Sequence, residues 1–183
     1  MDLFFSFATI YDAPELVKLV NSAYRGDVSK KGWTTEADLL DGQRTDYEEI
    51  LNLIEKPNSS ILVARTQQKE IIACCEIRII DANYFYPTNE THKNLYFGMF
   101  SVNPNLQNQG IGKLFLNKIE EYGKKWNSKM IQMTVITLRS ELLSYYQRRG
   151  FIITKHIVPF PSETKFGIAK VSGLEMVVLE KPI

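Results

Sequence analysis

One stretch, residues 95–126, constrains the fold of this chain more than any other. Residues 95–102 are apolar and aromatic and favour a strand, whereas residues 110–126 repeat apolar side chains at helical spacing. The apolar face of that helix comprises Ile111, Leu114, Phe115, Ile119, Tyr122 and Trp126. Two glycines, Gly110 and Gly112, stand where the strand must turn into the helix. A strand that passes directly into an amphipathic helix is typical of α/β domains.

The other segments continue this alternation of strands and helices. Further strands are predicted at residues 3–10, 60–65, 70–80, 130–137, 151–158 and 174–179. Further helices are predicted at residues 12–26, 34–40, 47–54 and 140–149, with a loop at 26–32. Asp12 and Glu15 form a capping-box pair at the start of the first helix. No repeat, low-complexity tract or linker interrupts this order, so we expect one α/β (α+β) domain, residues 1–183, around a mixed sheet.

Composition excludes several classes of function. The 22 Lys and Arg residues nearly balance the 21 Asp and Glu residues, for a net charge of +1. Bulk electrostatics therefore favour neither nucleic acid nor an anionic membrane as a partner. No apolar run approaches the ~18 residues of a membrane span, and the first residues lack the pattern of a signal peptide. We expect a cytoplasmic protein.

The residue types that bind metals or form disulfides are sparse in this chain. The two cysteines, Cys74 and Cys75, are adjacent, and in a strand they point to opposite faces. They give no disulfide framework and suit a reducing compartment. His92 and His156 have no metal-ligand spacing. We therefore expect no metal site.

The turn at residues 107–113, Q-N-Q-G-I-G-K, carries the chemistry. A helix start presents unpaired N–H groups and a positive dipole end, and glycine lets the backbone approach a phosphate closely. A dinucleotide fingerprint would need glycine where Phe115 stands. A P-loop would need glycine in place of Gln107 and a hydroxyl in place of Leu114. Both rivals fail, which leaves another phosphate cradle or an ordinary glycine-rich helix start.

The pattern Q-x-x-G-x-G at 107–112 resembles the acetyl-CoA pyrophosphate loop of the GNAT superfamily of N-acetyltransferases. Residues 146–151, Y-x-x-x-G-F, and 102–104, V-x-P, resemble two further elements of that family. These motifs lie within residues 95–151, and the order of elements agrees along the whole chain. The resemblance implies a strongly twisted mixed central sheet of about seven strands with helices on both faces. The sheet would be splayed at residues 95–102, and acetyl-CoA would be the acyl donor.

The resemblance also implies where acetyl-CoA would bind. Its pantetheine arm would lie in the splay and bond to the strand backbone near Phe100 and Val102. Its pyrophosphate would accept N–H bonds across the turn that follows the motif residue Gln107. The residues of that turn are Gln109, Gly110, Ile111, Gly112, Lys113 and Leu114. The Lys113 side chain either adds positive charge there or is simply solvated.

Members of the family transfer the acyl group directly from the thioester to an amine. Tyr146 matches the position that protonates the departing thiolate, the alternative being a packed aromatic residue. Many relatives place a glutamate base on the strand before the loop, but residues 96–101 contain no carboxylate. Glu76, on the neighbouring predicted strand, is the substitute base; an outward solvated carboxylate or an ordered water chain are the alternatives. Arg139 stands where many relatives have asparagine.

The acceptor site in such folds is built by the first helices and the last loop. Tyr24 and Trp33 are the candidates to line it, and Arg25 and Arg44 are candidates to hold a substrate carboxylate. The other aromatic residues of these two regions are Tyr47, Phe160 and Phe166. The first hypothesis is therefore an acetyltransferase acting on a small-molecule amine. The alternatives are a protein lysine or N-terminal acetyltransferase and a non-catalytic CoA-binding sensor; a homodimer is left open.

Overall fold

A seven-stranded sheet forms the centre of the computed structural model, which describes residues 2–161 and 167–183. In spatial order its strands are β1 (Phe4–Phe7), β3 (Ser59–Arg65), β4 (Ile71–Asp81), β5 (Lys93–Val102), β6 (Met130–Ile136), β9 (Glu175–Pro182) and β7 (Ile152–Pro159). Only β5 and β6 are parallel among these neighbouring pairs. The predicted mixed sheet is confirmed.

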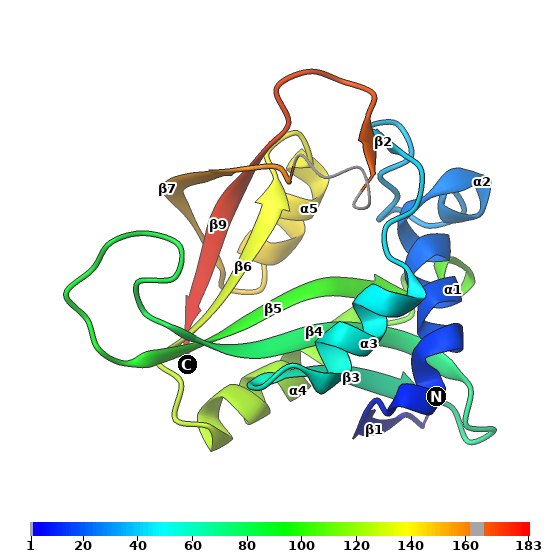
Figure 1. The fold of residues 1–183 in the computed structure, drawn as a ribbon, viewed down its shortest axis with the longest axis horizontal. Helices are drawn as coiled ribbons and strands as arrows, with labels where there is room; N and C mark the ends of the chain where they lie inside the picture. Colours follow the sequence, from blue (N-terminus) through cyan, green and yellow to red (C-terminus); the bar gives the residue numbers. More distant parts are fainter. Residues whose placement is uncertain (1, 162–166) are drawn as a thin grey trace.

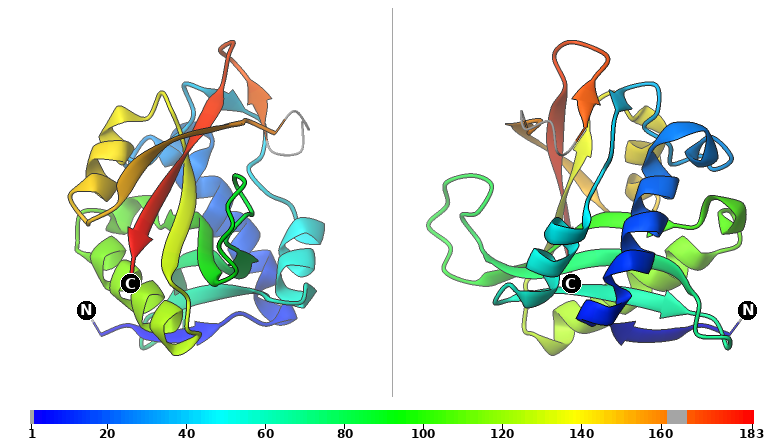
Figure 2. Two further views of the ribbon diagram at one scale, coloured as in Figure 1. Left: turned by 90° about the vertical axis from the view of Figure 1, so that its left-hand side faces the viewer. Right: turned by 45° about the vertical axis from the view of Figure 1, so that its right-hand side comes forward.

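Helices cover both faces of this sheet (Figures 1 and 2). Its α-helices are α1 (Ala13–Tyr24), α2 (Gly26–Ser29), α3 (Tyr47–Glu55), α4 (Ile111–Lys125) and α5 (Ser140–Gln147). Two short 3-10 helices, η1 (Ile10–Asp12) and η2 (Pro104–Leu106), and a small ladder of β2 (Leu40–Asp41) with β8 (Ile168–Ala169) complete the fold. None of the helices in the described ranges is long and apolar enough to cross a membrane.

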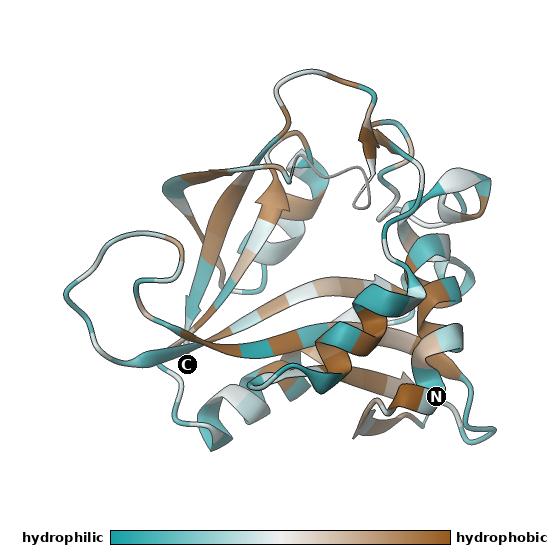
Figure 3. Ribbon diagram, in the orientation of Figure 1, coloured by the Kyte–Doolittle hydropathy of each residue, from teal (hydrophilic) through white to brown (hydrophobic). Residues whose placement is uncertain are grey.

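Two apolar cores lie on opposite faces of the sheet. One packs α1 and α3 against β3 and β4, and the brown inner faces of these helices are visible in Figure 3. The other packs α4 and α5 against β5 and β6. Cys74 belongs to the first core and Cys75 to the second, so the two thiols point to opposite faces as predicted. Both are free and buried.

The sheet splits between β5 and β6. Their pairing ends at Tyr96 and Gln132, and Figure 1 shows β6, β9 and β7 diverging from β5, β4 and β3 beyond that point. A bulge lies in β5 at the same place, because the pairing with β4 shifts and Met99 has a left-handed backbone with φ of 50°. Beyond Tyr96 the edge of β5 is therefore not paired with β6, which is the splay expected at residues 95–102.

Three local predictions at the N-terminal end were wrong. Residues 34–40 form turns leading into β2 rather than a helix, because the Glu36 N–H bonds to the carbonyl of Tyr24 at 3.0 Å. The expected loop at 26–32 contains the short helix α2. The capping box joins Thr9 and Asp12 ahead of η1 rather than Asp12 and Glu15. Glu15 instead accepts the N–H of Ile71 at 2.8 Å, a contact between helix and sheet that local spacing cannot reveal.

Candidate functional site

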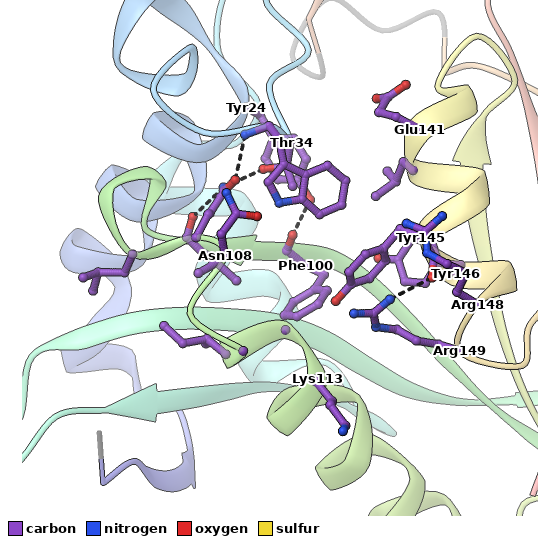
Figure 4. Close-up of a pocket in the computed structure, with 18 residues that line it drawn as sticks. Tyr24, Thr34, Phe100, Asn108, Lys113, Glu141, Tyr145, Tyr146, Arg148 and Arg149 are labelled. Carbon is purple, nitrogen blue, oxygen red and sulfur yellow. Dashed lines mark hydrogen bonds between the residues drawn. The ribbon is translucent and has the colours of Figure 1, made fainter.

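Two cavities meet where β5 and β6 separate. The first, of about 560 Å³, lies between the 107–113 turn and α5 (Figure 4). The second, of about 400 Å³, is lined by residues of α1, α3, β4, β5 and β6. The residues that line both are Tyr24, Phe100, Leu142 and Tyr146. A donor and an acceptor placed in the two cavities would therefore meet at these four residues.

The turn before α4 presents backbone N–H groups to the first cavity. Gly110 caps the helix with φ of 81°, a left-handed conformation that favours glycine. The N–H groups of Lys113 and Leu114 already bond to the Gly110 carbonyl, at 3.0 and 3.1 Å. Ile111 and Gly112 occupy the first two helical positions, whose N–H groups have no acceptor within a helix. Of the predicted amide donors, Gln109 to Leu114, the last two, Lys113 and Leu114, are therefore already engaged within the helix.

Not every residue predicted from the motif faces this cavity. Gly110, Ile111, Gly112 and Lys113 line it, whereas Gln109 and Leu114 do not. Leu114 is instead exposed to solvent.

Gly112 is required by the close approach of α5. A Cβ atom at this position would lie 2.5 Å from the Tyr145 hydroxyl oxygen. The Tyr145 ring packs on Trp33 with centroids 5.0 Å apart, and the Arg149 guanidinium lies 3.4 Å from its centroid. The packed side chains of Trp33, Tyr145 and Arg149 form one wall of the first cavity.

Three cations line the first cavity. Lys113 lies on the α4 side, and Arg148 and Arg149 lie at the end of α5 (Figure 4). Positive side chains around the N-terminus of a helix suit a diphosphate. These residues therefore fit the pyrophosphate of a CoA thioester.

The edge of β5 faces the same cavity. The Asn103 N–H donates to the Ile72 carbonyl on β4, and Ser101 pairs with Cys74 of the same strand. Because the N–H and C=O groups of successive residues in a strand point to alternate edges, those of Val102 point away from β4. The Phe100 carbonyl accepts the Tyr24 hydroxyl at 2.7 Å. Phe100 and Val102 both line the first cavity, where the pantetheine prediction places them.

Gln107 positions its neighbours through its side-chain amide. Its Oε1 accepts the N–H of Trp33 at 2.9 Å, and its Nε2 donates to the Thr34 hydroxyl at 2.8 Å and to the Val102 carbonyl at 3.2 Å. The motif glutamine therefore ties residues 33–34 to the strand and the turn. It lines the first cavity with its amide already engaged.

Tyr146 sits at the junction of the two cavities. Its side chain is 3% exposed and packs edge-on against Phe97 and Phe151. Burial, with the neighbouring Tyr24 and Tyr145, raises the pKa of its phenol well above the usual value. The hydroxyl is therefore protonated at neutral pH, as a proton donor must be.

Glu76 projects from β4 into the second cavity. It is only 8% exposed, so the alternative of an outward, solvated carboxylate is wrong. Its Oε1 lies 3.5 Å from Nε of Arg78, and neither atom has a hydrogen-bond partner in the described part of the chain. Burial raises the pKa of the Glu76 carboxyl, and Arg78 opposes that shift. A raised pKa makes the carboxylate a stronger proton acceptor than an ordinary glutamate.

The acceptor candidates divide between the cavities. Tyr24 lines both, and Phe160 lines the second, but Trp33 lines only the first and so lies on the side of the 107–113 turn. Arg25 is buried and pairs with Glu36 at 2.5 Å, a structural contact rather than a substrate contact. Tyr47 is exposed to solvent, and Phe166 lies outside the described residues.

Arg44 and several unpredicted residues also line the second cavity. Arg44 lies 5.7 Å from the centroid of the Tyr24 ring. Arg78 could have been found from the sequence, because it follows Glu76 by two residues and so shares its face of the strand. Tyr84 and Tyr96, which stack on Arg78 at 5.2 and 4.8 Å, carried no such signal. Among the residues that the structure describes, no group of three or more His, Cys, Asp or Glu could hold a metal.

Comparison with known proteins agrees with this geometry. The model of the acetyltransferase (GNAT) family matches residues 17–151. A putative phosphinothricin N-acetyltransferase superposes with a TM-score of 0.69 at 12% identity, over 100% of this chain and 99% of that one. A GNAT-family acetyltransferase from Streptococcus pneumoniae superposes with a TM-score of 0.66 at 21% identity, over 100% of both chains. Chaetomium thermophilum Naa20, solved with a bisubstrate analogue, superposes with a TM-score of 0.70 at 14% identity, over 98% of this chain and 86% of that one.

These structural likenesses show the fold alone, because every identity is low. No curated protein matches the chain by sequence.

Proposed function

The chain belongs to the acetyltransferase (GNAT) family, and we propose that it transfers an acetyl group from acetyl-CoA directly to a primary amine of a small molecule. The observation that carries this proposal is the meeting of two cavities at Tyr146. The first has the amide donors and cations that a CoA thioester needs. The second, of about 400 Å³, is of the size that holds small ligands.

The first cavity supports acetyl-CoA as the donor, as in the rest of the family. We propose that the N–H groups of Ile111 and Gly112 bind its pyrophosphate, with Lys113 and Arg149 adding charge. The edge of β5 at Phe100 and Val102 would bind the pantetheine arm. Gln107 would position this edge through its amide bonds rather than contact the ligand with its side chain.

Glu76 in the second cavity and Tyr146 at the junction divide the proton transfers between them. Acetyl-CoA supplies an acetyl group activated as a thioester, so that a C–N bond forms to the amine as the C–S bond breaks. An amine is protonated at neutral pH, and we propose that Glu76 accepts the proton that it loses. The Tyr146 hydroxyl would donate a proton to the departing sulfur. Glu76 thus takes the place of the base that β5 lacks.

Replacement of Tyr146 by phenylalanine tests this proposal. Thiol release from acetyl-CoA would be followed over a panel of amines and peptides, and CoA affinity by calorimetry. We expect Tyr146→Phe to lower kcat by roughly 100-fold, the lower range for losing a general acid, and to leave CoA affinity unchanged. Tyr11→Phe is the matched control, because Tyr11 is 87% exposed and lines neither cavity. An unchanged kcat would contradict the assignment of Tyr146.

The same panel separates the alternatives. Turnover of peptides but not of small amines would favour a protein acetyltransferase. Tight CoA binding with no thiol release from any amine would favour a non-catalytic sensor.

A further inference from the structure

We infer that the acceptor amine carries a carboxylate, and that Arg139 and Arg44 in the second cavity bind it; a free amino acid is the substrate class that meets this description. The inference rests on the proposed function for the position of the amine. The binding of the anion stands on the two arginines themselves.

Arg139 is a buried cation whose hydrogen-bonding capacity is only partly used. It follows β6 at the N-terminus of α5, is 4% exposed and lines the second cavity. Its Nε donates to Glu141 at 2.6 Å. Its Nη1 and Nη2 have no hydrogen-bond partner among the described residues. Buried guanidinium N–H groups without acceptors cost free energy, so an acceptor brought by a ligand would be stabilising.

The nearest carboxylate does not supply that acceptor. Glu36 is 3.7 Å from Nη1 of Arg139, beyond hydrogen-bond distance, and its other oxygen lies 2.5 Å from Arg25. Glu36 is thus shared between two arginines and bonded closely only to Arg25. The outer guanidinium nitrogens of Arg139 are therefore left without a hydrogen-bond acceptor among the described residues.

Arg44 provides the second cation. It is half-buried, lies over the Tyr24 ring and forms no ion pair within the described residues. Arg44 and Arg139 both influence the Tyr24 phenol electrostatically, so both lie near the junction of the cavities. Neither lines the first cavity. Their ligand is therefore the acceptor rather than the CoA thioester.

The charge of the second cavity favours a zwitterion. Its described lining contains the acids Glu36, Glu49 and Glu76 and the bases Arg44, Arg78 and Arg139, three of each. A ligand with one ammonium and one carboxylate adds no net charge to this balance, whereas a polyamine would add uncompensated positive charge beside three arginines. With the ammonium near Glu76 and Tyr146, the carboxylate of an amino acid is left to the arginines.

Paired ligands test the inference. The probes are the twenty common L-amino acids and their carboxamides, titrated calorimetrically into the protein saturated with CoA. We expect at least one amino acid to bind about tenfold or more tightly than its amide, as befits a charge-assisted hydrogen bond. Arg139→Gln and Arg44→Gln should each reduce that preference without changing CoA affinity. Lys18→Gln, which removes an exposed cation outside both cavities, should leave it intact.

Each outcome decides the matter. Amides that bind as well as the acids would overturn the inference and favour the N-terminus of a peptide, whose first carbonyl is an amide. Absence of binding by every amino acid would overturn it as well. If Arg139→Gln fails to fold, Arg44→Gln and the charge-retaining Arg139→Lys carry the test.

Thiol release, measured separately, distinguishes this failure from failure of the proposed function. Turnover of amines without a preference for the carboxylate contradicts only the anion site. Carboxylate-dependent binding without thiol release contradicts only the enzyme.

Discussion

The Tyr24 hydroxyl donates a hydrogen bond to the carbonyl oxygen of Phe100 at 2.7 Å. This bond joins the last residue of α1 to β5, one residue after the bulge at Met99. Both residues line both cavities. Burial raises the pKa of the Tyr24 phenol, which keeps the proton that the bond requires. The first helix therefore fixes the strand at the point where the sheet opens.

Tyr24→Phe should destabilise the protein. The change removes the donor and leaves the partly buried Phe100 carbonyl without this hydrogen bond, which costs roughly 1–2 kcal/mol. In a chain of this size that corresponds to a decrease in Tm of about 2–8 °C. Thermal unfolding measures it, with Tyr11→Phe as the exposed control. Equal Tm values for Tyr24→Phe and the unmodified protein would show that this bond contributes nothing.

Glu76→Gln should lower activity and raise stability at neutral pH. Burial raises the pKa of this carboxyl above its ordinary value of 4.5 in the folded protein. The folded state therefore binds the proton more tightly than the unfolded state. The contribution of Glu76 to stability is greatest below pH 4.5 and is lost as the pH rises through the raised folded pKa. Glutamine carries no charge to desolvate, so the variant avoids that loss.

Two measurements check this expectation. At pH 7 the Tm of Glu76→Gln should exceed that of the unmodified protein, by about 2–4 °C for each kcal/mol of stability gained. In the unmodified protein kcat should rise with pH as Glu76 loses its proton, at a higher pH than for an ordinary carboxyl group, and this rise should disappear in the variant. Glu90→Gln, at an exposed position in the loop between β4 and β5, is the control. A variant that is less stable and retains the rise of kcat with pH would contradict the assignment of Glu76 as base.

Gly110→Glu/Gly112→Glu should abolish CoA binding. The two glutamates would place negative charge and bulk against the helix start, where Ile111 and Gly112 present their N–H groups. The side chain at 112 would also meet the Tyr145 hydroxyl. Calorimetry with CoA measures the effect, which we expect to exceed 100-fold in Kd, about 2.7 kcal/mol. Gly173→Glu is the control, because Gly173 has a left-handed backbone like Gly110, with φ of 69°, and no atom within 4 Å of an added Cβ. This variant should bind CoA normally. Equal affinity in the double variant would remove the basis for the pyrophosphate site.

The sequence predicts the centre of this fold better than its N-terminal part. Residues 95–126 were predictable because an apolar strand, a glycine turn and an amphipathic helix are local patterns with distinct periodicities. Tyr146 was proposed instead through the resemblance of residues 146–151 to a family motif, and the glycines of the turn through the motif at 107–112. The helix wrongly predicted at 34–40 is different, because the backbone of these residues is held in turns by the Tyr24 carbonyl and by the β2–β8 ladder. Such partners are distant in sequence and leave no periodic trace.

Side-chain partners across the molecule were equally hidden. Trp33 was predicted to line the acceptor site, and the structure places it in the first cavity alone, where Gln107, 74 residues away, accepts its N–H. The sequence marked Arg139 only as a departure from a motif. Its unpaired guanidinium nitrogens became visible once Glu36 was placed beside Arg25.

Gln107→Ala should loosen residues 33–34 and weaken CoA binding indirectly. The variant loses three bonds at once, to the Trp33 N–H, the Thr34 hydroxyl and the Val102 carbonyl. Partly buried groups left without partners cost about 1–3 kcal/mol. Because Trp33 packs on Tyr145, the wall of the first cavity should move with it.

Hydrogen exchange at the Trp33 amide measures this local effect directly. We expect faster exchange there in Gln107→Ala, together with a lower Tm and weaker CoA binding. Gln107→Glu separates the bonds, because its carboxylate still accepts the Trp33 N–H but cannot donate to Thr34 or Val102. It should therefore keep the amide protected while losing part of the stability. Unchanged exchange at Trp33 in the alanine variant would mean that the loop is held by its other contacts, and that Gln107 acts on the ligand instead.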